Sequence, residues 1–588
     1  MGSNPPAEGY KSCHHHCHDR GEGFRQNVIL SNRTIMNQPS LGTSESLYDA
    51  LWNARVSYTN NENHCFIPFD ELQLARNPDL VKIALQNDGV PQSEVPELLS
   101  RICAPYPPKC GISYFRIFAI LVLCENAGCI KRFVDQGVDD SYLPLPAVKR
   151  NGDKFSFSRH TNGPKINDDR LLALFQDHNK WRSLTLNQFN TCQWWAIAPF
   201  FDQPDAVIPH YVLESNDILP LTEKKSHLEL EIKSLDPDVQ EVVLRGGFGD
   251  VFIVKMHRSH YHFRNQPYSD GSHSFALKRL KSPNANEFQL EVDALRKYSY
   301  GIDKHLIPLL ATIEKDDDAG KYYLLFPKAN GDLRHLWKTQ FMANPDNATV
   351  RWMAEQCLGI AKALSMLHQD QDKYKDEGYP IYGRHGDIKA GNILWFSKPG
   401  NPGPTGWRLV LSDFGLMRFH RAVSISVQTA SKLKKTLTYQ APEFDIAGAK
   451  VSRKSDIWAL GCTYLEFVTC CISGPQAVET EFPSCRGESD TKLHGVSEDK
   501  FYHTIGDGSG AELKPGVRSW ISNLRRDPRC SQYFYEFLTF IEDKMLCIER
   551  DKRPAAAEVV KSLDALSTKC RNDSYLKKGY FPTNNGVQ

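Results

Sequence analysis

The sequence lacks any long apolar run. The best candidate for a membrane span, Ile117 to Cys124, is far shorter than the roughly 18 residues that a membrane-spanning helix needs, and it directly follows Arg116. It is therefore expected to be a buried core helix. The N-terminus also has no apolar segment ahead of a small-residue cleavage site, so secretion is not expected.

The sequence also lacks a charge bias and a disulfide pattern. Its 71 basic and 70 acidic residues give a formal net charge of +1, which favours neither nucleic acid nor an acidic surface as a partner. The 16 cysteines are scattered, without the dense spacing of a disulfide scaffold. They are expected to be reduced thiols in an intracellular protein, located in the cytoplasm, the nucleus or both.

One short segment, Cys13-His14-His15-His16-Cys17-His18, contains metal-binding side chains. No second Cys/His pair follows at zinc-finger distance, so a polar tail is favoured over a zinc site, and metal binding there stays open. The surrounding residues 1–45 have no hydrophobic periodicity and are expected to form a disordered leader.

Residues 46–235 are expected to form a mainly helical accessory domain. A helix is predicted after Asn77, because this capping residue and a proline precede apolar residues at helical spacing. The segment from Val95 to Phe133 shows the same periodicity, interrupted at Pro107-Pro108. This region contains no nucleophile–base pair, phosphate-binding loop or metal-ligand spacing, so its role is left open, with docking of a partner as one possibility.

The stretch from Tyr382 to Leu394 contains the chemistry around which the C-terminal half is organised. It places a carboxylate, an amine and a carboxamide at Asp387, Lys389 and Asn392, and a second carboxylate follows at Asp413. Phosphoryl transfer needs an acid to orient a hydroxyl, a cation to neutralise the moving phosphate, and oxygen ligands for magnesium. These residues therefore predict phosphoryl transfer.

A glycine-rich turn precedes this stretch. Residues 241–254 predict a strand, a turn at Gly246, Gly247 and Gly249, and a second strand. Glycine lets backbone amides approach phosphate oxygens because it has no Cβ. The turn is thus a candidate phosphate cradle.

A lysine-bearing strand and a helix follow the turn. Residues 275–280 predict a strand that holds Lys278 among apolar neighbours, a suitable place for an ammonium group that binds phosphate. Phe288 and Leu295 lie at helical spacing with Glu291, which is expected on the same inward face as a partner for Lys278. Glu287, one turn earlier, is the alternative partner.

Taken in order, these segments resemble the eukaryotic protein kinase family. The resemblance covers residues 236–568 and rests on the following motifs: Gly246-Gly247-Phe248-Gly249-Asp250-Val251, Ala276-Leu277-Lys278, Glu291, His385-Gly386-Asp387-Ile388-Lys389-Ala390-Gly391-Asn392, Asp413-Phe414-Gly415, Ala441-Pro442-Glu443, Asp456-Ile457-Trp458-Ala459-Leu460-Gly461 and Arg553. It implies an α+β, bilobal kinase fold with a small β-rich lobe and a large helical lobe. The accessory domain precedes it, a polar insert interrupts it at about 470–500, and residues 569–588 form a tail. The insert is either a docking element or a plain loop.

The resemblance also implies an activity, which is transfer of the γ-phosphate of ATP to serine or threonine of a protein, with Mg²⁺. Asp387 would orient the acceptor hydroxyl, Lys389 would stabilise the phosphoryl group, and Lys278 would pair with Glu291. The implied nucleotide-binding residues are Gly246, Gly247, Gly249, Val251, Ala276, Lys278, Phe326 and Lys328, and the implied magnesium ligands are Asn392 and Asp413. Leu325 would gate the back of the adenine pocket.

The sequence departs from the family pattern at two positions. Leu244 replaces the first glycine of the loop, which is expected to weaken nucleotide affinity. Gly386 replaces the arginine that gathers a phosphorylated activation loop, as in kinases of the non-RD type, so switching by loop phosphorylation is in doubt. Arg384 is a candidate substitute for that arginine. The candidate phosphosites, which an ordinary polar loop explains equally well, are Ser424, Ser426, Thr429 and Ser431.

Two interpretations other than an active protein kinase stay open. One is a pseudokinase that serves as a nucleotide-binding scaffold, and the other is a kinase-like enzyme that acts on small molecules. The first is disfavoured because Lys278, Asp387, Asn392 and Asp413 are all present. The residues around Arg384 and the segment Cys192-Gln193-Trp194 show a looser similarity to kinases of filamentous fungi that have an N-terminal accessory region.

Overall fold

The computed structural model describes residues 46–57, 64–104, 112–152, 154–158, 166–203, 207–226, 249–263, 271–282, 284–298, 303–317, 320–341, 343–368, 384–401, 403–413, 437–487, 499–505, 508–580 and 582. The chain divides into two compact units. The N-terminal unit comprises Met1–Arg55, Phe69–Pro199 and His210–Ile218, and the C-terminal unit comprises Val56–Pro68, Phe200–Pro209 and Leu219–Gln588. The leader at 1–45 lies outside the described residues.

The N-terminal unit is mainly helical, as the sequence predicts. Its helices are α1 (Leu47–Asn53), α2 (Phe69–Ala75), α3 (Pro78–Asn87), α4 (Val95–Ile102), α5 (Phe115–Leu123), α6 (Ile130–Asp135), α7 (Asp168–Leu174) and α8 (Ser183–Ala196), and its strands are β1 (Ala147–Asn151), β2 (Lys154–Ser158) and β4 (His210–Leu213). α3 begins where expected, because the side chain of Asn77 accepts a hydrogen bond from the Asp79 N–H at 2.9 Å. Every residue of α5 except Arg116 is buried, and the helix packs against α8, so its apolar run is core.

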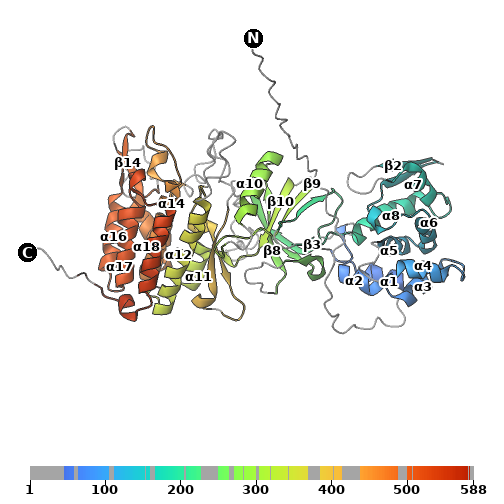
Figure 1. The fold of residues 1–588 in the computed structure, drawn as a ribbon, viewed down its shortest axis with the longest axis horizontal. Helices are drawn as coiled ribbons and strands as arrows, with labels where there is room; N and C mark the ends of the chain where they lie inside the picture. The colour runs from blue at the N-terminus through green and yellow to red at the C-terminus, as the bar shows by residue number, and fades with distance from the viewer. Residues whose placement is uncertain are drawn as a thin grey trace, which may run out of the picture. The chain divides into compact units, whose positions relative to one another are not determined.

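The small lobe of the C-terminal unit is built on an antiparallel sheet (Figure 1). Its strands in this unit follow the order β9 (Ala311–Asp317), β10 (Gly320–Pro327), β8 (Ser274–Leu280), β6 (Gly249–Met256) and β5 (Leu221–Ser226). α10 (Ala285–Tyr298) packs on the sheet, with the ring of Phe288 stacked 4.3 Å from that of Tyr322. Phe288, Val292 and Leu295 are buried, which confirms the predicted inward face of this helix.

The first strand of this sheet comes from an unexpected place in the sequence. The sequence predicts the partner of β6 at residues 241–244, which lie outside the described residues, whereas the structure pairs β6 with β5 at Leu221–Ser226. β5 precedes residue 236, where the sequence predicts that the kinase region begins. A fragment that starts at 236 would therefore lack one strand of the sheet.

Segments from much earlier in the chain also belong to the C-terminal unit. β3 (Phe201–Asp202) pairs in parallel with β7 (Tyr261–His262), and the buried ring of Phe66 lies edge-on to His260 at 5.2 Å. The backbone N–H of Thr312 in β9 donates to the carbonyl of Pro209 at 3.0 Å. The unit thus includes residues from within the range 46–235, which the sequence assigns to the accessory domain.

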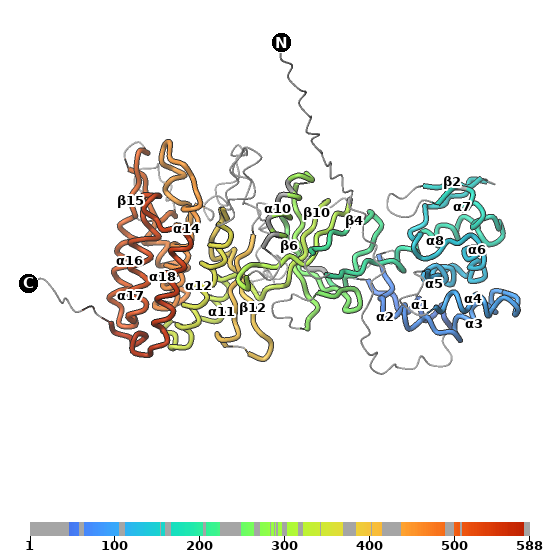
Figure 2. The backbone as a smooth tube through the Cα atoms, viewed as in Figure 1, coloured from blue at the N-terminus to red at the C-terminus, as the bar shows by residue number. Residues whose placement is uncertain are grey.

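The large lobe is helical and surrounds one hydrophobic core. Its helices are α11 (Leu333–Gln340), α12 (Asn347–His368), α14 (Lys454–Ser473), α15 (Phe482–Gly487), α16 (Pro515–Arg526), α17 (Gln532–Phe540) and α18 (Ala556–Lys569), and its strands are β11 (Gly331–Asp332), β12 (Ile393–Ser397), β13 (Trp407–Leu411), β14 (Tyr502–Ile505) and β15 (Gly510–Leu513). α14 is buried on all sides, as expected of a central helix. α12 packs along α18 (Figure 2).

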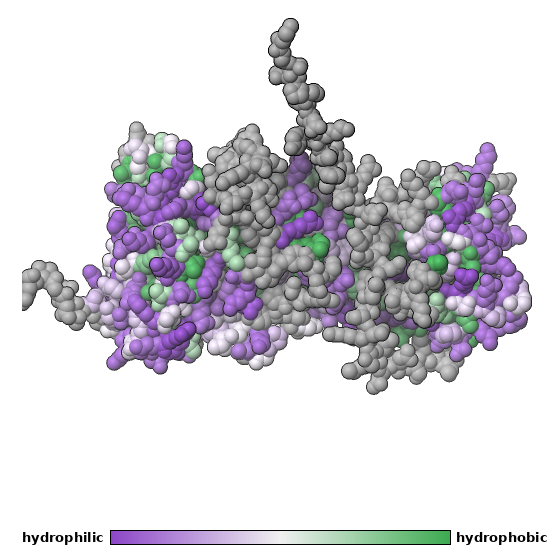
Figure 3. Space-filling model, in the orientation of Figure 1, coloured by the Kyte–Doolittle hydropathy of each residue, from purple (hydrophilic) through white to green (hydrophobic). Residues whose placement is uncertain are grey.

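The outer helices of this lobe are amphipathic. In α16 the residues Val517, Ile521 and Leu524 recur at helical spacing and are buried. The face of α16, α17 and α18 that Figure 3 shows is mainly hydrophilic, with scattered apolar side chains. Among the described residues, no helix combines the length and the apolar character that crossing a bilayer requires.

A buried histidine links the two lobes of this unit. We expect its burial to make the fold sensitive to acid. His305 is 3% exposed, and its Nδ1 hydrogen-bonds the carbonyl of Leu409 at 2.7 Å. Gly359 in α12 leaves room for the ring, since a Cβ there would overlap the imidazole of His305. Burial lowers the pKa of His305 to about 4, so the ring is neutral in the folded protein at pH 7.

We expect the burial of His305 to lower the free energy of unfolding at acidic pH. Because its folded pKa is below the ordinary value of about 6.5, the unfolded chain takes up a proton first, and stability that is complete above pH 6.5 falls as the pH approaches 4. The difference between the two pKa values corresponds to a loss of about 3 kcal/mol in the free energy of unfolding. Urea unfolding at pH 7 and pH 4.5 should show this loss for the wild type and a much smaller loss for His305→Gln. Equal losses in both proteins would contradict the prediction.

Candidate active site

A buried carboxylate fixes the position of the loop that contains Asp387. Asp456, in α14, accepts hydrogen bonds from the backbone N–H groups of His385 at 2.8 Å and Gly386 at 2.9 Å, and from His368 Nε2 at 2.9 Å. Burial raises the pKa of Asp456, but the contact with His368 and the bond from Gly386 outweigh it, and the pKa is below its ordinary value. Asp456 is therefore ionised and holds the loop, as the resemblance implies.

The backbone explains the glycine ahead of Asp387. Gly386 has φ of 86°, in the left-handed region that glycine adopts without strain. The candidate substitute for the missing arginine, Arg384, places its guanidinium 5.5 Å from the ring centre of Phe444. Burial lowers the pKa of Arg384, opposed by Asp456 and Glu443. Arg384 thus faces the segment that follows Ala441-Pro442.

The carboxylate of Asp387 lies between a cation and an amide. Lys389 Nζ donates to Asp387 Oδ2 at 2.6 Å, and Asn392 Nδ2 donates to the same oxygen at 2.9 Å. Asn392 Nδ2 also donates to the carbonyl of Asp387 at 2.7 Å. The loop therefore brings together the three groups that the sequence places at i, i+2 and i+5. A hydroxyl next to Asp387 would have an acceptor and an adjacent positive charge.

The β12–β13 hairpin brings Asn392 close to Asp413. Ile393 pairs with Leu411, and both the N–H and the Oγ of Ser412 donate to the carbonyl of Asn392 at 2.9 Å. Since the amide nitrogen of Asn392 faces Asp387, its amide oxygen points elsewhere. Amide and carboxylate oxygens suit magnesium, so Asn392 and Asp413 fit the role of its ligands. Within the described part of the chain, no group of three or more His, Cys, Asp or Glu side chains could hold a metal ion.

An ion pair joins the small lobe to Asp413. Lys278 Nζ, from β8, lies 3.0 Å from Asp413 Oδ1, and the two side chains are 12% and 30% exposed. Burial raises the pKa of Asp413, but the charge of Lys278 and its hydrogen bond outweigh it, so the pKa is lowered. The side chains of Glu291 and Glu287 lie outside what the structure describes, so the choice of acid on α10 stays a prediction.

The strand register shows which residues share a face with Lys278. Lys278 lies opposite Val251 in β6 and Leu324 in β10, and Ala276 lies opposite Phe326. Directly opposed residues point to the same side of a sheet. The predicted nucleotide-binding residues Val251, Ala276 and Phe326 are therefore on the same face as the lysine. Lys328 is exposed immediately after β10 ends at Pro327.

The same register places the predicted gate residue, Leu325, on the face of the sheet away from Lys278. Leu325 lies opposite Leu277, so it is on the other face of the sheet from Ala276 and Lys278. Phe326, which lies opposite Ala276, is on the same face as Lys278. Because alternate residues of a strand face opposite sides, an error of one position places a side chain on the wrong face, and only the pairing partners reveal it.

The close packing of two strands explains why residue 249 is glycine. Gly249 pairs with Leu280, and a Cβ at this position would lie 2.6 Å from the carbonyl oxygen of Arg279. The close approach of β6 to β8 therefore requires glycine here, independently of any phosphate. The other predicted loop glycines, Gly246 and Gly247, lie outside the described residues, as do Phe414, Gly415 and the four candidate phosphosites.

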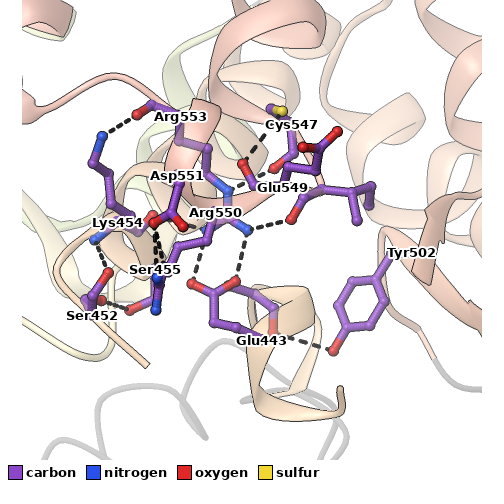
Figure 4. Close-up of polar contacts among 12 residues, drawn as sticks. Glu443, Ser452, Lys454, Ser455, Tyr502, Cys547, Glu549, Arg550, Asp551 and Arg553 are labelled. Carbon is purple, nitrogen blue, oxygen red and sulfur yellow. Dashed lines mark hydrogen bonds and ion pairs between the residues drawn. The ribbon is translucent and has the colours of Figure 1, made fainter. Parts of the chain in front are cut away.

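The predicted ion pair between Glu443 and Arg553 is present and fully buried (Figure 4). Two parallel hydrogen bonds join them, at 2.9 Å from Nη1 and 2.7 Å from Nη2. The guanidinium also donates to the carbonyls of Cys547, Lys454 and Ile548. All five N–H groups of Arg553 are thereby used, and the pair ties the end of the activation segment to the loop ahead of α18.

Comparisons with known proteins agree with this site. The family model described as "Protein kinase domain" matches residues 245–563. Receptor-like protein kinase HAIKU2 of Arabidopsis thaliana is 29% identical over 43% of this chain and 23% of its own length. A G-type lectin S-receptor-like serine/threonine-protein kinase of the same plant is 29% identical over 38% of the chain and 24% of its own length.

An animal relative, Cyclin-dependent kinase 8 of Drosophila melanogaster, is 26% identical over 38% of the chain and 44% of its own length. The chain therefore spans less than half the length of each of these three relatives. The matched residues include every group of the site described above. The chain belongs to the protein kinase family.

Proposed function

We propose that this protein is an ATP- and Mg²⁺-dependent kinase that phosphorylates serine or threonine in proteins. The observation that supports it best is the placement of Asp387, Lys389 and Asn392 in one hydrogen-bonded group close to Asp413. Asp413, in the large lobe, in turn forms an ion pair with Lys278 of the small lobe. A pseudokinase is disfavoured because each of these groups is present and satisfied by the others.

Each residue has a role that follows from its contacts. Lys278 is a cation on the nucleotide face of the sheet, within hydrogen-bond distance of Asp413, where phosphate oxygens would meet both the lysine and a magnesium ion. Asn392 and Asp413 would hold that ion, which supplies charge neutralisation to the phosphates. Asp387 would accept the hydrogen bond of the acceptor hydroxyl, and Lys389 would offset the charge of the moving phosphoryl group.

The choice of serine or threonine rests on Lys389. Its ammonium group lies 2.6 Å from Asp387, so it would be beside the transferred phosphate. A relative that is named as a serine/threonine-protein kinase supports this choice. The similarity to fungal kinases and the intracellular location stay predictions, and the roles of the accessory domain and of the Cys13–His18 cluster stay open.

The test is transfer of label from γ-labelled ATP, with Mg²⁺, to a generic basic protein by the full chain. We expect phosphoserine or phosphothreonine in the acceptor. The variant Lys278→Met should transfer about 100-fold less, because the phosphates lose their cationic anchor. Absence of label from the wild type, or label on tyrosine alone, would overturn the proposal.

A matched control is Lys255→Met on the neighbouring strand. Lys255 is the nearest alternative lysine for holding the phosphates, but it pairs with Glu223 at 2.6 Å and its side chain is 49% exposed. We expect this variant to retain activity. Loss of activity in Lys255→Met with full activity in Lys278→Met would reassign the role.

A further inference from the structure

A group of buried charges lies beneath the segment that precedes Ala441-Pro442-Glu443. Tyr439 donates from its hydroxyl to Glu466 Oε2 at 2.7 Å, and Arg334 Nη2 donates to the same hydroxyl at 3.2 Å. Burial and then the nearby charge of Glu466 raise the pKa of Tyr439, so the phenol is protonated and acts as a donor to Glu466. Tyr439 is therefore held from α14 and α11.

A second arginine reaches this group from the polar segment that the sequence describes as an insert. Arg486, at the end of α15, is 2% exposed and lies under two aromatic rings, with its guanidinium carbon 4.3 Å from the ring centre of Phe482 and 4.6 Å from that of Phe501. Its Nη1 lies 3.6 Å from Glu466 Oε1 and makes no hydrogen bond within the described residues. Charge rather than a hydrogen bond therefore links Arg486 to Glu466.

The other side of Arg486 holds an aspartate that reaches the same segment. Arg486 Nε donates to Asp499 Oδ1 at 2.7 Å, and Asp499 Oδ2 accepts from the hydroxyl of Thr438 at 3.2 Å. Asp499 is 37% exposed at its side chain, so its position depends on these two partners. Arg486 thus contacts the partners of both Thr438 and Tyr439, the two residues that lead into the Ala441-Pro442-Glu443 segment.

The position of Arg486 is itself fixed by the fold. The fully buried Lys514 donates to the carbonyl of Arg486 at 2.9 Å, and the rings of Phe482 and Trp520 stack at 5.2 Å beside it. Two cations, Arg334 and Arg486, face two acids, Glu466 and Asp499, and the buried ammonium of Lys514 lies beside Arg486.

We propose that Arg486 is a positioning residue for the protein substrate. Through Glu466 and Asp499 it sets Tyr439 and Thr438, and with them the surface that receives the acceptor polypeptide, while the nucleotide site stays independent of it. This inference rests on the proposed kinase function. It assigns to Arg486 in α15 and to Asp499 a role in holding substrate.

The test compares Arg486→Met with the wild type, using a histone fraction as the acceptor. We expect the KM for histone to rise roughly tenfold, because misplacement of a binding surface by a fraction of an ångström weakens productive binding. The KM for ATP and the hydrolysis of ATP without acceptor should change less than twofold. Arg486→Lys keeps the charge and should recover part of the loss.

The matched control is Arg529→Met, which removes an arginine of the connection between α16 and α17 that pairs with Asp527 at 2.6 Å. It should leave all constants unchanged. An unchanged KM for histone in Arg486→Met would overturn the inference, and so would equal losses for histone and ATP, which would indicate only a structural role. If the wild type itself transfers no label, the proposed function fails instead.

Should Arg486→Met not fold, Asp499→Asn tests the same path from its partly exposed end. This variant keeps the shape of the side chain and weakens both the bond from Thr438 and the pair with Arg486. We expect it to raise the KM for histone and to leave the KM for ATP unchanged. A wild-type profile in Asp499→Asn would overturn the inference.

Discussion

The Asp387→Asn variant is expected to transfer phosphate about a thousand times more slowly than the wild type, with its affinity for ATP almost unchanged. Asparagine has the size of aspartate and can still accept from Lys389 and Asn392, so the loop should keep its structure. It lacks the negative charge that orients and accepts the hydrogen bond of the acceptor hydroxyl. The loss should therefore be in kcat.

Single-turnover label transfer and binding of a fluorescent ATP analogue measure these two properties separately. The matched control is Asp564→Asn on α18, an exposed aspartate whose side chain is 60% exposed. It should behave as the wild type. Loss of ATP binding in Asp387→Asn would refute the assigned role, because the residue would then be holding nucleotide, and so would full turnover.

The second large effect concerns stability. Replacing Arg553 by methionine is expected to cost about 4 kcal/mol in the free energy of unfolding, because it leaves the carboxylate of Glu443 buried without its partner. Three backbone carbonyls that Arg553 also binds lose their donor. Urea unfolding followed by tryptophan fluorescence measures the change, since Trp458 lies 5.3 Å from the guanidinium.

Two further variants separate the pair from its surroundings. The double variant Arg553→Met with Glu443→Gln should recover part of the loss, since it removes the unpaired buried charge. Arg529→Met, which breaks a partly exposed pair, should cost no more than about 1 kcal/mol. A cost for Arg553→Met as small as that for Arg529→Met would show that the buried pair does not hold the large lobe together.

The sequence predicted the chemistry of the site because its groups are close together along the chain. Asp387, Lys389 and Asn392 lie within six residues, so one short loop brings them together whatever surrounds it. Helix boundaries such as the start of α3 after Asn77 are local in the same way, since a cap acts within one turn. The family motifs then identified Lys278, Asp413, Asp456 and the pair of Glu443 with Arg553 as members of the same assembly.

Strand pairing could not be predicted in the same way. The register that puts Phe326 rather than Leu325 opposite Ala276 depends on which hydrogen bonds join β10 to β8. Likewise, β5 at Leu221–Ser226 takes its place beside β6 across a separation that no local pattern records. Both are long-range choices in which a whole strand gains or loses its partners together.

By itself, then, the sequence determined the protein kinase family, the helical character of the N-terminal unit and the grouping of Asp387, Lys389 and Asn392, because those depend on local spacing and on motif order. Only the tertiary structure decided the first strand of the sheet, the face of Phe326 and the connection of Arg486 to Tyr439 and Thr438. The physical reason is that buried charges and strand edges are satisfied by partners distant in the sequence, and their identity depends on the folded chain.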